Sequence, residues 1–409
     1  MKRAHIVGGS LGGLFAALLL HRAGWQVQVH ERVTGQLAGR GAGIVTHPEL
    51  FTALQACGVG LNDTIGVTVR SRVTLATDGS VLAEASMPQV LTSWGRLYQL
   101  LRSHLPDASY TQGSQVLAVH PIDGGASLQL ADGRSIEGEL VVAADGIRST
   151  LRPILLPAVR PEYAGYVAWR GLVDEADLSL ATREAIFDKF AFCLPPHEQM
   201  LGYPVAGAGD TVAVGRRRFN FVWYRPAGEA ILTDLQTDVD GRTHDGGIPP
   251  QRIRADVVQA MRTAAEQVLA PQFAEVIRCT TQPFFQPIYD LCSPRLAFGH
   301  ITLLGDAAFV ARPHCGMGVT KAAGDALALV QALDAEPDIP QALLRYEAER
   351  VAFGAAVVGH ARHLGAYMQA QLHTAAEREA AERYRTPEAV MRETASSRAF
   401  QVHAKAVHV

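Results

Sequence analysis

A glycine-rich turn near the N-terminus constrains the fold of this chain more than any other feature. The stretch HIVGGSLGGLFAALLL begins with a short apolar run and crosses a turn that contains Gly8, Ser10 and Gly13. It then continues as an apolar helix over residues 14–21. The spacing is that of the dinucleotide fingerprint, with serine at its middle position. A strand, a tight turn and a helix in this order place a pyrophosphate against unpaired N–H groups at the helix N-terminus.

The residues after this helix complete a nucleotide-binding unit. Gly24 ends the helix, and a second strand over residues 27–30 leads to Glu31. This carboxylate lies roughly 20 residues beyond the glycines, where an acidic side chain is expected to bind ribose hydroxyls. The simpler alternative is a tight turn between a strand and a helix that binds nothing. The order of strand, turn, helix, strand and acid favours a Rossmann-like domain.

Composition and charge exclude several other classes of protein. The chain has 409 residues and a formal net charge of -3, with acidic and basic residues interspersed, which argues against nucleic acid as a partner. Its cysteines are scattered without a CxxC pair, as expected for reduced thiols in the cytoplasm. No apolar segment approaches the roughly 18 residues that span a bilayer. His360 and His363 lack nearby ligands, so no metal is expected.

The chain alternates between two kinds of sequence. Residues 1–165 carry nucleotide-type elements, together with alternating strands near 67–92 that we assign to a second domain. Residues 166–283 are β-rich, residues 284–342 return to the first kind, and residues 343–409 are helical. The pattern predicts a discontinuous α/β nucleotide-binding domain, an inserted β-rich substrate domain and a C-terminal helical segment.

Three aromatic residues alternate within the β-rich part. Phe219, Phe221 and Trp223 lie two positions apart, so their side chains share one face of a strand. Two interpretations remain open at this point. The face either packs on a helix or forms an aromatic surface over a flat ligand.

Two aspartates follow apolar strands later in the chain. One strand ends at Asp145, and a second, HITLL, leads through a glycine to Asp306. In open α/β sheets, the ligand crevice lies outside the carboxyl ends of the strands. Pro313 and the glycine loop Gly316–Gly318 then open another helix, which indicates a second point of negative charge on the same ligand.

These three motifs, in this order, resemble the flavin-dependent aromatic hydroxylases of the p-hydroxybenzoate hydroxylase fold. The resemblance extends over nearly the whole chain. The stretches GGSLGG, GIVTHPEL, YAGYVAWRG, DKF and GDAAFVARPH look more closely like the 2,6-dihydroxypyridine 3-monooxygenases, which also have serine at the position of Ser10. The resemblance implies FAD as the cofactor, NADH or NADPH as a transient electron donor, and O2 as the oxidant.

The resemblance also implies roles for individual residues. Glu31 is expected to hold the adenosine ribose, Arg32 and Arg40 to lie at the adenine end or the pyrophosphate, and the backbone at Val116 to line the adenine. Asp306 is expected to bind ribityl or ribose hydroxyls. The expected cofactor-binding set is Gly8, Ser10, Leu11, Gly13, Glu31, Arg32, Arg40, Val116, Asp145, Asp306, Pro313, Gly316, Met317 and Gly318.

One position departs from the family pattern. Many relatives have arginine or glutamine at the start of the helix TSWGRLYQLL, where this chain has Trp94. Arg96 and Arg102 are the candidate substitutes for that contact to the flavin chain.

The implied reaction explains why these groups are needed. NAD(P)H reduces the flavin, oxygen adds at C4a to form a hydroperoxide, and the distal oxygen passes to an electron-rich ring. The helix N-terminus at Gly316–Gly318 is expected to stabilise negative charge on the flavin without a protonatable side chain. The inserted β-rich domain is expected to keep the site dry.

Several residues are candidates for contact with the substrate. The substrate ring becomes more reactive when its hydroxyl is deprotonated. The candidate catalytic positions are His47, Tyr203, His314 and Pro313, which directly precedes His314. His47 is alternatively a loop or cap residue, and Tyr203 a core tyrosine. The expected substrate-binding set is Tyr203, Phe221, Trp223 and His314.

The predicted function is hydroxylation of a hydroxylated pyridine such as 2,6-dihydroxypyridine. The alternatives are hydroxylation of another phenol or a salicylate-type ring, and a non-hydroxylating flavoprotein such as a halogenase or a redox sensor. A halogenase would need a Trp-x-Trp-x-x-Pro signature, which FVWYRP does not provide. The family resemblance also suggests a homodimer.

Overall fold

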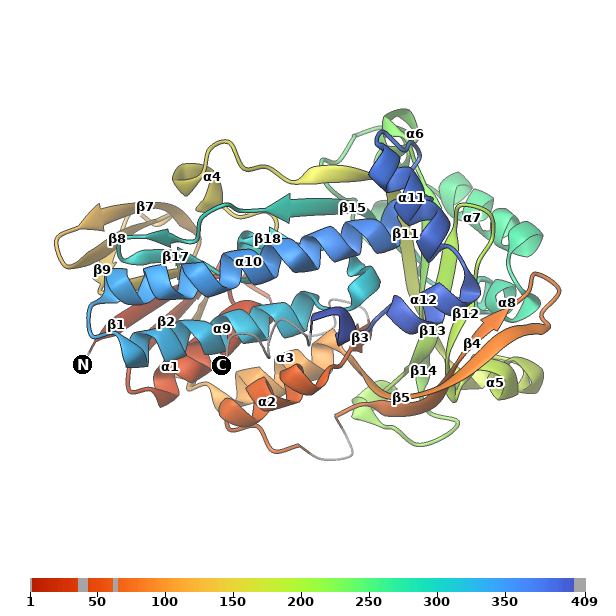
Figure 1. Cartoon of the computed structure of the whole chain (residues 1–409), viewed down its shortest axis with the longest axis horizontal. Coiled ribbons are helices and arrows are strands. Elements are labelled where there is room, and N and C mark those ends of the chain that lie inside the picture. The colour runs from red at the N-terminus through yellow and green to blue at the C-terminus, as the bar shows by residue number, and fades with distance from the viewer. Residues whose placement is uncertain (1, 36–42, 62–64, 401–409) are drawn as a thin grey trace.

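The computed structural model describes residues 2–35, 43–61 and 65–400. Two large β-sheets lie at opposite ends of helix α10 (Ile339–Gly365), which runs from one sheet to the other in Figure 1. The fold confirms the predicted α/β class with a helical C-terminal region. Within the described residues, no helix is long and apolar enough to cross a membrane.

The first sheet is the nucleotide-type sheet predicted from the N-terminal sequence. Its strands β1, β2, β6, β10 and β17 are parallel, and β16 is an antiparallel edge strand. In spatial order the strands are β16 (Ala297–Phe298), β17 (Ile301–Leu303), β10 (Leu140–Ala143), β1 (Arg3–Val7), β2 (Gln26–Glu31) and β6 (Tyr110–Gln112). The central strands are buried on both faces, which is why they read as continuous apolar runs.

Helices α1 (Leu11–Arg22) and α9 (Gly318–Ala335) pack together on this sheet. Both begin after glycine-containing turns, at the edge of the sheet where the parallel strands end. The six-stranded sheet therefore gathers the three sequence motifs along one edge, although they are far apart in the chain.

The second sheet has nine strands and contains most of the β-rich sequence. In spatial order they are β18 (Phe309–Val310), β15 (Phe284–Cys292), β11 (Glu162–Asp174), β14 (Arg218–Pro226), β13 (Gln199–Val205), β12 (Lys189–Cys193), β4 (Val67–Leu75), β5 (Val81–Ser93) and β3 (Gly43–Val45). Strands β4 and β5 join this sheet from the N-terminal part of the chain. The sequence-based boundary at 283/284 falls at the start of β15, which pairs with β11.

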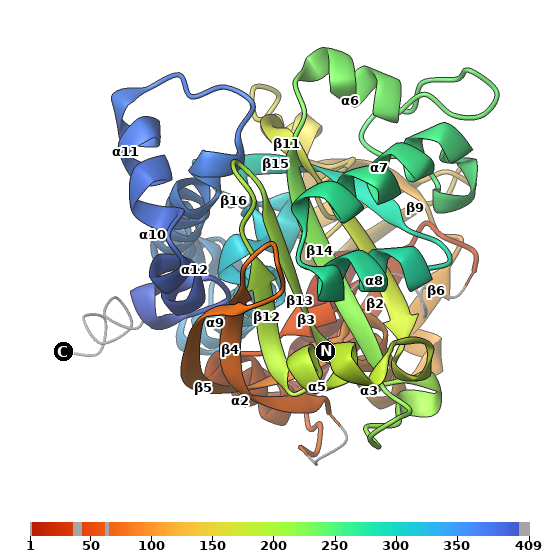
Figure 2. The same ribbon diagram turned by 90° about the vertical axis from the view of Figure 1, so that its right-hand side faces the viewer.

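The outer face of the nine-stranded sheet is covered by helices. Figure 2 shows α7 (Ala255–Val268) and α8 (Pro271–Cys279) lying across this face. Phe219, Phe221 and Trp223 are fully buried there, in one cluster with side chains of both helices such as Met261 and Phe273. The aromatic face is thus a sheet packed on helices, and the assignment of Phe221 and Trp223 as substrate contacts is wrong.

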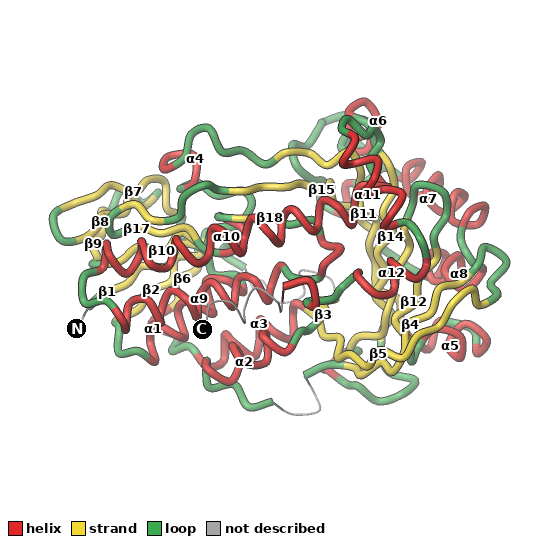
Figure 3. The backbone as a smooth tube through the Cα atoms, viewed as in Figure 1, coloured by secondary structure: helices red, strands yellow, loops and turns green. Residues whose placement is uncertain are grey.

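The remaining elements complete the two halves. They are α2 (Pro48–Ala56), α3 (Trp94–His104), α4 (Arg152–Leu155), α5 (Leu180–Ile186), α6 (Glu229–Leu235), α11 (Ala375–Tyr384), α12 (Pro387–Glu393) and a small sheet of β7 (Val116–Ile122), β8 (Gly125–Leu130) and β9 (Ser135–Gly138). After α10 the chain turns back, and α12 lies beside β4 and β5 (Figure 3).

Candidate active site

The glycine turn brings the ends of β1 and β10 into close contact. Gly8 has a φ of 104°, and a Cβ there would lie 2.4 Å from the carbonyl oxygen of Ala144. A Cβ at Gly13 would lie 1.9 Å from the carbonyl oxygen of Gly8. Both positions therefore require glycine, and glycine at each of them allows the tight turn at the start of α1.

A pocket of about 270 Å³ opens directly beside this turn. We call it the turn pocket. It is lined by Val7, Gly8, Ser10, His30, Glu31, Arg32, Val33, Trp94, Ser114, Gln115, Val116, Ala144, Asp145, Gly146 and Thr150. The structure therefore brings together Gly8, Ser10, Glu31, Arg32, Val116 and Asp145 from the predicted cofactor set. The Leu11 side chain is instead part of the core, and Arg40 lies outside the described residues.

Glu31 supports the turn as well as lining the pocket. Its Oε2 accepts a hydrogen bond of 2.8 Å from the amide of Gly9, and its Oε1 accepts one of 2.9 Å from the amide of Val33. Each carboxylate oxygen has a further lone pair. Glu31 can therefore hold the backbone and still accept from a ligand hydroxyl.

Asp145 contributes an acceptor that has no protein partner. Its Oδ2 accepts from the amides of Thr150 at 2.7 Å and Leu151 at 3.2 Å. Its Oδ1 is buried and has no hydrogen-bond partner among the described residues. A buried acceptor of this kind is normally satisfied, so it fits a ligand that brings hydroxyl donors.

Arg152 links the two aspartate turns. Its guanidinium donates to the carbonyl oxygens of Ile147 at 2.6 Å and Ala307 at 3.2 Å. Because Ile147 follows Asp145 and Ala307 follows Asp306, this single side chain sets the distance between the two motifs. Only the turn itself, not this role of Arg152, was evident from the sequence.

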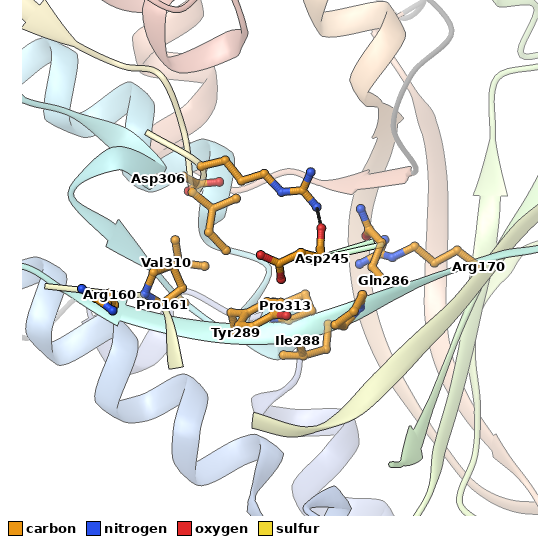
Figure 4. A pocket seen from close by; sticks show the side chains of 15 residues that line it. Arg160, Pro161, Arg170, Asp245, Gln286, Ile288, Tyr289, Asp306, Val310 and Pro313 are labelled. Carbon is orange, nitrogen blue, oxygen red and sulfur yellow. Dashed lines mark hydrogen bonds between the residues drawn. The ribbon is translucent and has the colours of Figure 1, made fainter. Parts of the chain in front are cut away.

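A second, larger pocket of about 850 Å³ lies between the two sheets (Figure 4). We call it the interdomain pocket. It is lined by Ile147, Arg148, Arg160, Pro161, Arg170, Asp245, Gly246, Gln286, Pro287, Ile288, Tyr289, Asp306, Val310, Ala311 and Pro313. Asp306 and Pro313 were predicted site residues. The Asp306 side chain is exposed on the wall of this pocket, where a ligand can reach its carboxylate.

A buried ionic network holds the turn that carries Asp306. The Nζ of Lys321 donates to the carbonyl oxygen of Gly305 at 3.0 Å and to Oδ2 of Asp325 at 3.1 Å. Arg350 pairs with Oδ1 of Asp325 at 2.8 Å. With all three charged side chains buried, α9 and α10 fix the Gly305–Asp306 turn as one unit.

The predicted loop from Pro313 to Gly318 leads into α9. A Cβ at Gly318 would meet no protein atom within 4 Å, so the space beside this helix N-terminus is open. The side chain of Met317 is buried in a cluster with Val357 and Ala361. His47 lies with its Nε2 3.2 Å from the carbonyl oxygen of Gly316 and so contacts the loop from the other side.

His314 is buried behind this loop. Its Nε2 lies 2.7 Å from the hydroxyl of Tyr166, and its ring packs edge-on against Tyr224 at 4.5 Å. Burial, reinforced by the charges of Arg312 and Arg170, lowers the pKa of His314 to about 3. His314 is therefore neutral at physiological pH, and its Nδ1 has no partner among the described residues.

The inner face of the nine-stranded sheet carries several buried polar side chains, among them Asn220, whose Oδ1 accepts from the amide of Gly43 at 2.9 Å. Tyr203 on β13 pairs in register with Asn220 on β14, and Arg170 on β11 is in register with Val222, so these residues share the face opposite Phe221 and Trp223. Figure 4 shows Arg170 extending from β11 toward Gln286. Arg170 Nε and Asn220 Nδ2 are buried donors without a partner in the described part of the chain.

Arg170 and Asn220 were not among the site residues predicted from the sequence, although the sequence contains a signal for them. Each is a lone polar residue inside an apolar strand, in YVAWRGLV and RFNFVWY. A buried polar side chain in such a strand needs a partner or a function. Burial raises the pKa of the predicted Tyr203, and the charge of Arg170, on the same face of the sheet, opposes that rise.

The comparisons with known proteins agree with this geometry. A family model described as FAD binding domain-like matches residues 163–290. The chain is 31% identical over 378 residues to the 2,6-dihydroxypyridine 3-monooxygenase of Paenarthrobacter nicotinovorans, covering 90% of this chain and 91% of that protein. The chain belongs to the family of FAD-dependent aromatic monooxygenases. It is also 30% identical to a 3-amino-4-hydroxybenzoate 2-monooxygenase of Streptomyces cremeus, over 88% of this chain and 86% of that one.

Solved structures support the same assignment. The 2,6-dihydroxypyridine-3-hydroxylase from Arthrobacter nicotinovorans superposes with a TM-score of 0.85 at 28% identity, covering 91% of this chain and 95% of that chain. A Klebsiella pneumoniae protein complexed with FAD and uric acid has a TM-score of 0.74 at 23% identity, covering 96% and 93% of the two chains, and shares the fold. The expectations of FAD, NAD(P)H and O2 are confirmed for this monooxygenase.

The residues of the monooxygenase fit its cofactor. The glycine turn, the orphaned Asp145 Oδ1 and the open space at Gly318 provide room and acceptors for a dinucleotide along one edge of the first sheet. At the position that departs from the family pattern, Trp94 itself lines the turn pocket and stacks on Tyr98 at 5.0 Å. Of the two candidate substitutes, Arg96 pairs with Asp210 at 3.0 Å and Arg102 with Asp107 at 2.6 Å, and neither lines the turn pocket.

Proposed function

We propose that this monooxygenase hydroxylates a hydroxylated pyridine such as 2,6-dihydroxypyridine. The observation that carries the proposal is the pair of unpartnered donors, Arg170 Nε and Asn220 Nδ2, on the inner face of the nine-stranded sheet. Oxygen substituents on a small ring are acceptors that match such donors. The positive charge of Arg170 also lowers the pKa of a ring hydroxyl placed beside it, which favours the deprotonated and more electron-rich ring.

We propose that FAD extends from the turn pocket to the interdomain pocket. It supplies electron transfer from NAD(P)H and the activation of O2. Glu31, Asp145 and Asp306 offer acceptors to its hydroxyl groups, and the N-terminus of α9 at Gly318 offers N–H donors to negative charge on its ring. The neutral His314 adds no competing charge behind the loop.

The nine-stranded sheet closes the other side of the site. Tyr203 is buried on its inner face and lies next to Asn220 in the ladder. A ring between this face and the Pro313–Gly318 loop would be shielded from bulk water, which protects reactive oxygen species from hydrolytic loss. In this arrangement Tyr203 orients the substrate, while the loop backbone orients the cofactor.

The proposal is tested by following NAD(P)H oxidation by the purified holoenzyme. We expect 2,6-dihydroxypyridine to stimulate oxidation and one atom of 18O2 to appear in the product. Stimulation by salicylate or simple phenols in its place would reassign the substrate class. Oxidation that no hydroxylated ring stimulates would contradict the proposal and favour a non-hydroxylating flavoprotein.

A pair of variants locates the substrate on the sheet. We expect Asn220→Ala to raise the KM for the ring without loss of FAD, because it removes one donor of the inner face. Phe221→Leu is the control, since it changes the neighbouring residue on the helix-covered face. Equal effects of the two substitutions would contradict the placement.

A homodimer and a cytoplasmic location are further parts of this proposal, taken from the family resemblance and the scattered cysteines.

A further inference from the structure

A chain of buried polar side chains leads through the first sheet to the turn pocket. His5 on β1 and His30 on β2 are each 5% exposed, and Ser114, just before β7, is 8% exposed. His5 Nε2 lies 3.1 Å from the carbonyl oxygen of Glu137, and His5 Nδ1 lies 3.1 Å from His30 Nε2. His30 Nδ1 lies 2.9 Å from Ser114 Oγ.

The carbonyl of Glu137 fixes the direction of every hydrogen bond in this chain. A carbonyl oxygen accepts only, so His5 Nε2 carries a proton and donates to it. A neutral imidazole has one N–H, which makes His5 Nδ1 an acceptor and His30 Nε2 its donor. His30 Nδ1 is then an acceptor too, and the hydroxyl of Ser114 must donate to it.

Both histidines are neutral at physiological pH. Burial lowers the pKa of His30 to about 4, and the positive charge of Arg134 acts in the same direction. Burial also lowers the pKa of His5, against the opposing effect of its bond to Glu137. The alternation of donors and acceptors therefore holds from His5 through His30 to Ser114.

The consequence appears at the turn pocket, which both His30 and Ser114 line. A serine hydroxyl has one proton and two lone pairs, and here the proton is committed to His30. We infer that Ser114 is an acceptor-only group that selects the nucleoside end of FAD by a hydrogen-bond donor, either the amine of the base or the 2′-hydroxyl of the ribose. If these hydrogen bonds ran in the other direction, Ser114 would offer a donor and would favour a base with a carbonyl at the same place.

The protonation pattern of the two histidines can be measured directly by NMR. With 15N-labelled histidine, NMR of the FAD-free and FAD-bound protein at neutral pH is expected to show His5 and His30 protonated at Nε2 and unprotonated at Nδ1. Assignment of the two signals follows from the variants His5→Gln and His30→Gln. A proton on Nδ1 of either ring, or doubly protonated rings, would overturn the inference.

The selectivity is tested by binding rather than by activity. Dissociation constants of FAD are compared with those of its hypoxanthine analogue and its 2′-deoxyadenosine analogue. We expect Ser114→Ala to weaken FAD about 3- to 10-fold, the value of one neutral hydrogen bond. In the unmodified protein, one of the two analogues should bind more weakly than FAD by a similar factor. In Ser114→Ala, that analogue and FAD should bind with equal affinity. The hypoxanthine analogue identifies the base amine as the donor, and the deoxy analogue identifies the ribose hydroxyl.

Two further variants separate selection from folding. Ser127→Ala removes a hydroxyl that bonds to Ser135 at 2.7 Å in the small sheet, away from the residues that line the pocket, and should leave all three dissociation constants unchanged. Ser114→Thr retains a hydroxyl and should restore FAD affinity. Unchanged ratios between FAD and both analogues in Ser114→Ala would overturn the inference, and that result would leave the hydroxylation proposal untouched.

Discussion

The hydroxyl of Tyr166 on β11 lies 2.7 Å from Nε2 of His314 in the loop before α9, and this hydrogen bond, together with the ion pair of Arg312 and Asp290, joins the nine-stranded sheet to that loop. Tyr166 is fully buried. In Tyr166→Phe, Nε2 of His314 would be left unpaired, and we expect the free energy of unfolding to fall by about 1–3 kcal/mol. Urea denaturation measures this change.

The matched control for that substitution is Tyr163→Phe. The Tyr163 hydroxyl bonds to the carbonyl oxygen of Ala227 at 2.8 Å, on the same strand but only partly buried. We expect a smaller loss, because water can replace the hydroxyl there. A loss in Tyr163→Phe equal to or greater than that in Tyr166→Phe would show that the bond to His314 has no special weight.

Gly318 offers a test of whether the space beside α9 is occupied by the cofactor. Gly318→Ala adds a Cβ that meets no protein atom within 4 Å, so the FAD-free protein should be as stable as before or slightly more stable. We expect its affinity for FAD to fall. Gly359→Ala, at another glycine with open surroundings on helix α10, should leave FAD affinity unchanged. Equal FAD affinity in both variants would show that the flavin does not approach Gly318.

The buried histidines predict loss of stability in mild acid. Burial lowers the pKa of His30 from 6.5 to about 4 and that of His314 from 6.5 to about 3. The unfolded chain therefore binds protons below pH 6.5 that the folded chain does not bind, and stability is complete above that pH and falls as the pH drops toward 4. The expected loss between pH 7.5 and pH 5 is on the order of 2 kcal/mol for each histidine.

The pH range of this loss distinguishes the contribution of the histidines to stability from that of the carboxylates. Asp325 and Glu175 have lowered pKa values, but their contribution is lost mainly below about pH 4.5, where carboxylates of the unfolded chain become protonated. Urea unfolding at pH 7.5, 6 and 5 checks the prediction. A free energy of unfolding that stays constant across this range would contradict neutral burial of His30 and His314.

The network around Asp325 predicts a large effect far from the substrate. Asp325→Asn leaves the buried Lys321 without a counter-charge and Arg350 with only the partly exposed Glu349, and breaking a buried ion pair in this way typically costs about 3–5 kcal/mol. We also expect weaker FAD binding, since the network holds the turn of Asp306. Glu336→Gln is the control, because its pair with Arg345 is largely exposed and should contribute less than about 1 kcal/mol. Thermal and urea denaturation of both variants measure the difference.

The sequence predicted the nucleotide-binding part well because local rules fix it. A side chain at Gly8 or Gly13 would collide with backbone, and buried parallel strands read as apolar runs, so the first turn and the Asp145 and Asp306 turns were all recognisable. Their convergence on one edge of the sheet follows from parallel strand order. The contact of His47 with Gly316 could not be predicted, because it joins positions far apart in the chain.

The β-rich part shows where sequence reasoning stops. A period of two assigns Phe221 and Asn220 to opposite faces but does not say which face meets the cofactor. Helices α7 and α8 decide that question by covering the aromatic face, and they come later in the chain. The lone polar residues Arg170 and Asn220 were the better signal, since burial of an unpaired donor requires a reason.

The most direct test of the account is titration of the oxidised holoenzyme with 2,6-dihydroxypyridine, followed by the change in flavin absorbance. We expect a saturable change in the unmodified enzyme and an unchanged dissociation constant in Phe221→Leu. In Arg170→Met we expect the dissociation constant to rise about tenfold or more, as for loss of a hydrogen bond to a charged group. A holoenzyme whose flavin spectrum does not respond to this ring, or responds equally in all three proteins, would contradict it.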